Sequence, residues 1–119
     1  MKKIIIAICF ILFAINVTAQ NDIIKKVEVS NDLTEVSIFY ENGTIMQHGF
    51  YTKEGLLDNT WESYNIDGSK KCIAYYKKGV KIGVWTYWNK GVISKVTYKD
   101  DKIISIKEFQ EDELLKNEN

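Results

Sequence analysis

Residues 79–91, with the sequence GVKIGVWTYWNKG, decide the fold of this 119-residue chain. The stretch begins and ends at a glycine, and between the two it carries a Gly-x-Trp step followed by the aromatic residues Tyr87 and Trp88. Glycine adopts the positive φ of tight turns without steric cost. Aromatic and β-branched residues are enriched in strands. The stretch therefore predicts a β-strand held between two turns.

A second copy of this stretch lies 24 residues earlier, measured between the first glycines. In both copies the tryptophan follows the first glycine by six residues, and another aromatic residue follows the tryptophan by three. A fixed period of about 20 to 50 residues is typical of repeat architectures, in which one supersecondary unit is stacked on the next. The matching residues are Gly55, Trp61, Tyr64 and Gly68 in the earlier copy and Gly79, Trp85, Trp88 and Gly91 in the later one.

Turn signals recur about every dozen residues, as in antiparallel hairpins. Asn42-Gly43 is one such signal, and the chain has no proline, so every strand can donate its full set of ladder hydrogen bonds. We expect an all-β fold, in which repeated β-hairpins form a twisted, largely single-layer antiparallel meander sheet. After a brief first strand around Val27 and Val29, the expected strands are residues 36–40, 44–51, 60–64, 72–76, 84–88, 92–98 and 103–109.

The N-terminus has the parts of a secretory signal peptide. It begins Met1-Lys2-Lys3, continues with an apolar run over residues 4–15 and reaches a small residue at Ala19. A membrane-spanning helix needs about 20 apolar residues, so this run is short for a permanent anchor. We interpret residues 1–20 as a signal peptide, with an uncleaved anchor as the alternative. The protein is then exported, to the periplasm or the extracellular space.

The rest of the chain divides by composition into a repeat domain at 21–109 and an acidic polar tail at 110–119. Without its signal peptide the chain keeps 14 of its 16 lysines, has no arginine and has 16 acidic residues. This balance gives no reason to expect a nucleic-acid partner. Eight lysines lie between Ser69 and Lys99 with no acidic residue among them. They serve either to prevent aggregation between sheets or to bind a partner.

The repeated pattern, Tyr-x-x-Gly-x-x-x-Gly-x-Trp-x-x-aromatic, resembles the MORN-repeat variants found in many exported bacterial proteins. Residues 76–88 carry the resemblance best, and residues 51–64 carry it less well, because Asn59 stands where Gly83 stands in the better copy. The resemblance covers roughly residues 36–109. It implies a single-layer sheet of hairpins. Members of the family, which includes YwqK-type antitoxins, are associated with membrane-lipid contact, protein scaffolding and antitoxin roles.

The sequence shows no set of residues that predicts catalysis. His48 is the only histidine and has no evident histidine, cysteine or spaced-carboxylate partner, so we interpret it as an ordinary strand residue. Asp100-Asp101 is interpreted as a polar turn, because neighbouring carboxylates without further ligands hold metal poorly. We therefore expect no enzyme activity, no cofactor and no metal.

The aromatic residues are the strongest indication in the sequence of a binding surface. They form either a ladder of ring contacts that replaces a thick core or, in part, an exposed binding face. Strand alternation places Trp85 and Tyr87 on one face and Trp88 on the other. The candidate binding residues are Tyr64, Tyr75, Lys77, Lys78, Tyr87 and Trp88.

The function expected from these observations is that of an exported, non-enzymatic binding or scaffold module. It presents an aromatic-and-lysine sheet face to a protein or cell-envelope component, with a weak contact to anionic lipid as a further possibility. The alternative is an antitoxin-like or immunity protein that masks a toxin. The sequence predicts neither the identity of the partner nor the oligomeric state.

Overall fold

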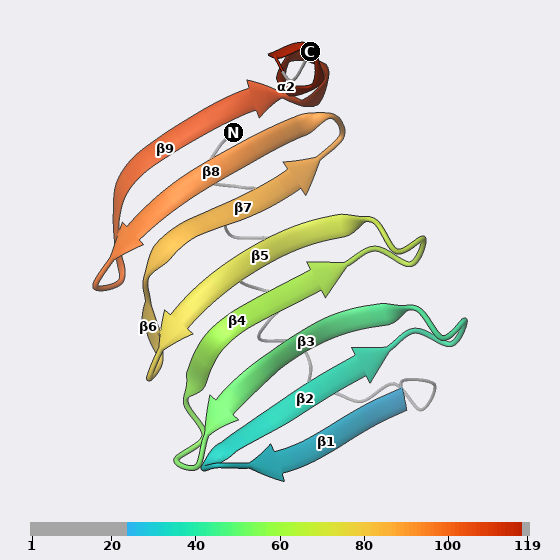
Figure 1. The fold of residues 1–119 in the computed structure, drawn as a ribbon, viewed down its shortest axis with the longest axis vertical. Coiled ribbons are helices and arrows are strands. Elements are labelled where there is room, and N and C mark those ends of the chain that lie inside the picture. The colour runs from blue at the N-terminus through green and yellow to red at the C-terminus, as the bar shows by residue number, and fades with distance from the viewer. Residues whose placement is uncertain (1–23, 118–119) are drawn as a thin grey trace.

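The computed structural model describes residues 24–117, which form one open antiparallel sheet and a short helix (Figure 1). The sheet order is β1-β2-β3-β4-β5-β7-β8-β9, with β6 paired to β5 beside this path. The predicted all-β hairpin meander is therefore confirmed. The elements are β1 (Ile24–Ser30), β2 (Leu33–Phe39), β3 (Ile45–Thr52), β4 (Leu57–Tyr64), β5 (Lys70–Lys77), β6 (Val80–Lys81), β7 (Gly83–Asn89), β8 (Val92–Lys99), β9 (Lys102–Gln110) and α2 (Glu111–Asn117).

Two predicted segments concern the ends of the chain. The predicted signal peptide, residues 1–20, lies outside the described residues. Of the predicted polar tail, residues 110–119, Gln110 ends β9 and residues 111–117 form α2, whose first turn is acidic, with Glu111, Asp112 and Glu113. Negative side chains are favourable there because they oppose the positive end of the helix dipole.

The departure from the repeat pattern at Asn59 leaves the backbone unchanged. Asn59 has a φ of 59° and Gly83, the matching residue of the later copy, has a φ of 73°. Both are in the left-handed region, which asparagine tolerates better than most residues other than glycine. The two copies therefore share one backbone conformation at this position.

The two repeat tryptophans lie on the same face of the sheet, which we call the tryptophan face. Trp61 is 1% exposed and Trp85 is 0% exposed. The Trp61 indole N–H donates to the carbonyl of Phe50 over 2.9 Å, and the Trp85 indole N–H donates to the carbonyl of Tyr75 over 3.1 Å. Each tryptophan is therefore hydrogen-bonded to the return strand of the hairpin before it.

Each tryptophan also meets a tyrosine of that preceding strand. The ring centroids of Tyr51 and Trp61 are 5.0 Å apart, and those of Tyr76 and Trp85 are 5.1 Å apart. Both pairs are edge-to-face contacts, the geometry that the charge distribution of aromatic rings favours. Later in the chain Tyr98 adds a second ring to Trp85, at 4.6 Å. The hairpins are thus joined by ring contacts as well as by ladder hydrogen bonds.

The ring of Trp61 packs directly against the backbone at Gly49. Gly49 is a strand glycine, paired with Val36 of β2, and the register between β3 and β4 skips it. A Cβ atom at Gly49 would lie 2.0 Å from Cδ2 of Trp61, a distance that no real contact allows. The absence of a side chain at this position is what allows the indole to lie flat on the sheet.

Side chains alternate between the tryptophan face and the opposite side, which we call the outer face. In β7, Trp85 and Tyr87 are buried whereas Thr86 and Trp88 are half-buried. The predicted division of Trp85 and Tyr87 from Trp88 is therefore confirmed.

We expect Gly49→Ala to lower the free energy of unfolding by about 1–3 kcal/mol, because the added methyl group overpacks against the Trp61 ring. A double-mutant cycle with Trp61→Ala, measured by urea denaturation, isolates this contact. In the Trp61→Ala background the Gly49 substitution should cost almost nothing. An equal cost in both backgrounds would show that the ring is not what excludes a side chain.

We expect Trp85→Ala to cost about 3–5 kcal/mol of stability, the usual effect of truncating a packed tryptophan. Trp88→Ala should cost clearly less, because a half-buried ring has less apolar surface removed from water. Tyr87→Ala should resemble Trp85→Ala, since Tyr87 is also buried. The denaturation midpoints of the three variants measure this ranking of stability losses, and equal midpoints for all three would contradict it.

Candidate functional site

The outer face carries four of the predicted binding residues. Tyr64 and Trp88 lie on either side of the beginning of β5, and Tyr75 lies further along β5 and is 39% exposed. Lys77 ends β5 on the same face, and Lys78 begins the turn to β6. The structure therefore places these candidates at the two ends of β5 and does not gather them in one spot.

Tyr87, the sixth candidate, lies on the tryptophan face and is 2% exposed. Its ring centroid is 6.3 Å from that of Trp85. Its side chain belongs to the packed core and offers no surface to a partner.

A groove of about 410 Å³ lies between the tips of the β4–β5 and β7–β8 hairpins, and we call it the tip groove. Trp88 lies in its wall, and the Lys70 ammonium is 5.6 Å from the centroid of the Trp88 ring, close enough for a cation–π contact. The groove combines one indole, two ammonium groups, two amides, a hydroxyl and one carboxylate. Its lining residues are Asn65, Ser69, Lys70, Trp88, Asn89, Lys90, Gly91 and Glu111.

One wall of the tip groove is fixed by hydrogen bonds within its own turn. The hydroxyl and the backbone N–H of Ser69 both donate to the Asp67 carboxylate, over 2.6 Å and 2.9 Å. The Asn65 amide donates to the Ser69 hydroxyl over 2.9 Å. Because Ser69 stabilises the charged carboxylate, the pKa of Asp67 is lowered. The polar groups of this wall are therefore held in place before any partner arrives.

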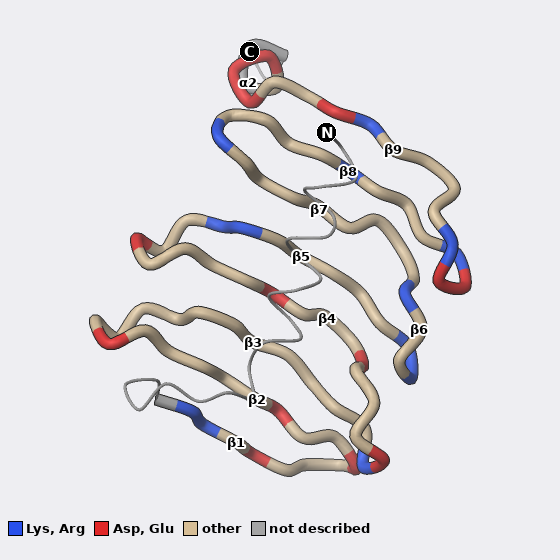
Figure 2. Tube along the Cα trace, turned by 180° about the vertical axis from the view of Figure 1, so that it is seen from behind, with Lys and Arg blue, Asp and Glu red and all other residues tan. Residues whose placement is uncertain are grey.

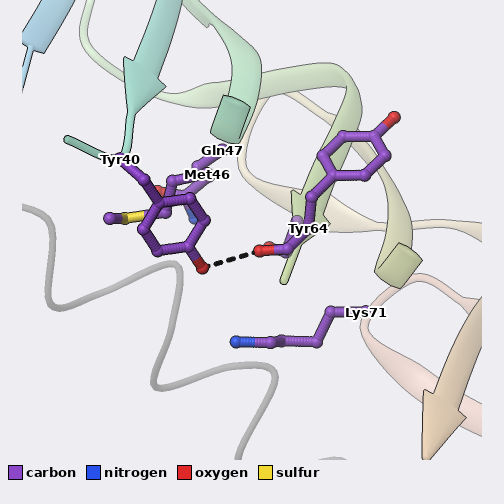
Figure 3. A pocket seen from close by; sticks show the side chains of 6 residues that line it. Tyr40, Met46, Gln47, Tyr64 and Lys71 are labelled. Atoms are coloured by element: carbon purple, nitrogen blue, oxygen red, sulfur yellow. Dashed lines mark hydrogen bonds between the residues drawn. The ribbon is translucent and has the colours of Figure 1, made fainter. Parts of the chain in front are cut away.

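A smaller pocket of about 240 Å³ lies between β3 and the β4–β5 hairpin (Figure 3). The Tyr40 hydroxyl donates to the backbone carbonyl of Tyr64 over 2.8 Å, and the Lys71 side chain reaches into the space below this bond. Burial, with a further contribution from Asp67, raises the pKa of Tyr40. The walls also include Met46, Gln47 and Ser63.

Four polar side chains that contact one another cross the outer face from β2 to β4, joined by two hydrogen bonds and one longer His48–Glu62 contact. His48 Nε2 is 2.6 Å from a Glu35 carboxylate oxygen, and His48 Nδ1 is 3.7 Å from a Glu62 carboxylate oxygen. The Tyr64 hydroxyl donates to the other oxygen of Glu62. This bond to a carboxylate raises the pKa of Tyr64 to about 12, with smaller contributions from burial and from the charge of Glu62.

The prediction that His48 lacks a spaced carboxylate partner is therefore wrong. Its partners lie 13 and 14 residues away, on the two neighbouring strands, because the register pairs His48 with Ser37 on one side and Glu62 on the other. Only a correct register would have revealed them. Among residues 24–117, no group of three or more histidine, cysteine or acidic side chains is arranged to hold a metal ion.

The lysine run follows the middle of the sheet and not its edges. The eight lysines between Ser69 and Lys99 lie in β5 to β8 or in the turns between them, and none lies on β1 or β9, the two edge strands. Lys81 lies 5.7 Å from the ring of Trp85 and 5.4 Å from that of Tyr98. Protection of a sheet edge therefore does not explain the run.

Comparison of the chain with protein-family models, with curated proteins and with solved structures finds no match. Within the described part of the chain, no helix has the length and apolar character needed to cross a membrane.

Several tyrosines should ionise only at unusually high pH. Burial raises the pKa of Tyr76, Tyr87 and Tyr98, and the bond to Glu62 raises that of Tyr64 to about 12, against about 10 in an unfolded chain. The folded state then holds more protons than the unfolded state above about pH 10, so stability is full below that pH and falls as pH rises towards 12.

A titration of phenolate absorbance, with circular dichroism in parallel, tests this. We expect one group of tyrosines to ionise in the folded chain and a second group to ionise together with unfolding. Tyr64→Phe should remove one late-titrating group. Ionisation of all tyrosines near pH 10 in a chain that stays folded would contradict the expectation.

Proposed function

We propose that this chain is an exported, non-enzymatic binding or scaffold module of the MORN-repeat type. It contacts a protein or cell-envelope component through the tip groove and the neighbouring outer face. The repeated Gly-x-Trp pattern and the open sheet of hairpins support this class of protein. The basic character of the groove wall favours a partner with anionic groups, such as acidic polymer, an acidic protein surface or anionic lipid.

The observation that carries the proposal is the placement of Trp88 and Lys70. Trp88 is the repeat aromatic residue that leaves the core, because strand alternation turns it away from Trp85. A half-buried indole on a strand is already ordered, so it provides contact area at a low cost in side-chain entropy. The Lys70 ammonium above its ring and Lys90 at the next turn add positive charge to the same groove.

The set of predicted binding residues changes with the structure. Trp88 and Tyr64 remain as outer-face residues beside the groove, and Tyr75, Lys77 and Lys78 lie at the far end of β5. Tyr87 leaves the set because it is buried. A binding role for Trp88 can therefore be separated from folding, whereas one for Tyr87 cannot.

The test is capture of partners from an envelope extract by immobilised protein. We expect wild type to retain a partner that the Trp88→Ala, Lys70→Gln variant loses, while both remain folded. The matched control is Leu56→Ala, Lys53→Gln, which removes an exposed apolar residue and a lysine at a distant turn. This control should retain the partner.

The identity of the captured partner separates the two functions. An abundant envelope component supports the scaffold role, and a single toxin-like protein supports the immunity alternative. Capture that is the same for wild type and the groove variant would overturn the proposed site. The salt dependence of capture then measures how much the lysines contribute to partner binding, because contacts between exposed charges weaken as salt rises.

A further inference from the structure

The charges of the sheet are divided along its stacking direction. Residues 24–64, which include β1 to β4, contain three lysines and seven acidic residues. Residues 65–110, which include β5 to β9, contain ten lysines and four acidic residues. Figure 2 shows acidic positions in both halves but most of the basic ones in the second. One half of the sheet is therefore net negative and the other net positive.

The outer face repeats this division in a single row of side chains that runs across the strands. The acidic and histidine side chains lie at the β3 and β4 end of the row, and two lysines lie at the β8 and β9 end. Glu35, hydrogen-bonded to His48, adds a second acidic group at the first end. In strand order the row is Lys26, Ser37, His48, Glu62, Ile73, Thr86, Lys95 and Lys107, and the Lys26 ammonium is paired with Glu28 at 3.1 Å.

The centre of the outer face is neutral and partly apolar. Ile73 and Thr86 are directly paired and half-buried there. Tyr75 and Val84, the next outward-facing residues of β5 and β7, are 39% and 43% exposed. Residues 24–117 form a single layer, so no described element covers this apolar surface (Figure 1). An exposed apolar patch with charged margins is typical of a protein interface.

We propose that a second copy of this chain docks on the outer face, turned by half a turn about an axis parallel to the strands, so that β3 and β4 of each copy lie on β9 and β8 of the other. A two-fold axis between β5 and β7 brings Ile73 of one copy to Thr86 of its partner. The same rotation brings Glu62 to the partner's Lys95, and the Glu35–His48 pair to the partner's Lys107. Because the interface is two-fold, each charge pair forms twice.

The dimensions of the face fit such a dimer. With the axis between β5 and β7, six strands of each copy overlap, namely β3, β4, β5, β7, β8 and β9. At about 4.8 Å between strands, and with about seven residues of about 3.3 Å each, they span roughly 24 Å by 23 Å. The two copies then bury roughly 1,100 Å² in total, at the small end of specific protein interfaces. The half turn also keeps the strands of the two sheets nearly aligned, which is one of the two stable ways in which sheets pack face to face.

The opposite orientation is disfavoured by the same charges. If the half turn were made about an axis along the row instead of an axis parallel to the strands, Glu62 would face Glu62 and Lys95 would face Lys95. Like charges facing each other across an interface suppress wrong arrangements. The inference goes beyond the proposed function, because it needs no external partner and involves mid-strand residues and not the hairpin tips.

The test uses two charge-reversal variants and sedimentation of the purified chain over a range of concentrations. Glu35→Lys with Glu62→Lys makes the four charges that meet across the interface all basic, and Lys95→Glu with Lys107→Glu makes them all acidic. We expect wild type to dimerise and each variant alone to dimerise about tenfold or more weakly. A mixture of the two variants should form heterodimers, because the basic face of one meets the acidic face of the other.

The variant with all four reversals keeps the experiment decisive if Glu62→Lys perturbs the contacts of His48 and Tyr64. In this variant the acidic and basic ends of the row are exchanged, so the acidic end of one copy still meets the basic end of the other. Dimerisation should therefore return. The matched control, Glu54→Lys with Lys102→Glu, reverses one turn charge and one strand-end charge outside the row and should dimerise like wild type. A monomeric wild type, a dimer that survives both reversals, or a failure of both the mixture and the four-fold variant to dimerise would overturn the proposal.

Discussion

The structure depends on the way each tryptophan lies flat on the hairpin before it. A single-layer sheet has no second layer to cover its apolar side, so the indole ring serves as that cover. Trp61 lies on Gly49 and donates to the carbonyl of Phe50, and Trp85 donates to the carbonyl of Tyr75 in the same way. This arrangement sets the repeat length, because the tryptophan must reach the return strand of the preceding hairpin. An isolated hairpin is marginal in water, and these contacts between hairpins provide the burial it lacks.

Most of the fold follows from local signals, and for that reason the sequence predicted it well. Turns depend on glycine, asparagine and aspartate in short segments, and the division between the two faces follows from the two-residue period of a strand. Asp100-Asp101 shows how local this information is, since both residues adopt positive φ, at 50° and 69°, in a turn where the other repeats use glycine. The predicted separation of Trp85 from Trp88 needed no knowledge of the neighbouring strands.

The features that the sequence did not reveal depend on register and on contacts between hairpins. His48 receives its carboxylate partners from β2 and β4, and Gly49 is explained only by a ring twelve residues further along the chain. The ladder between β3 and β4 also shifts between His48 and Phe50, so a regular pairing would have placed these side chains wrongly. Tyr87 was grouped with binding residues because composition cannot distinguish a packed aromatic ring from an exposed one. Its place on the tryptophan face removes it.

The charge division has little to do with stability within one copy. Among the described residues, His48 contacts Glu35 and Glu62 across neighbouring strands, and all three lie on the acidic half. Lysines that lie close together repel each other, and anionic charge brought to the half with ten lysines and four acidic residues relieves this repulsion. Two surfaces can supply that charge, an external partner at the hairpin tips and the acidic half of a second copy at the strand centres. Lys70 and Lys90 lie at the tips, whereas Lys95 and Lys107 lie within β8 and β9. The basic half therefore has separate lysines for each of the two proposed contacts, and occupation of one surface would leave the charges of the other available.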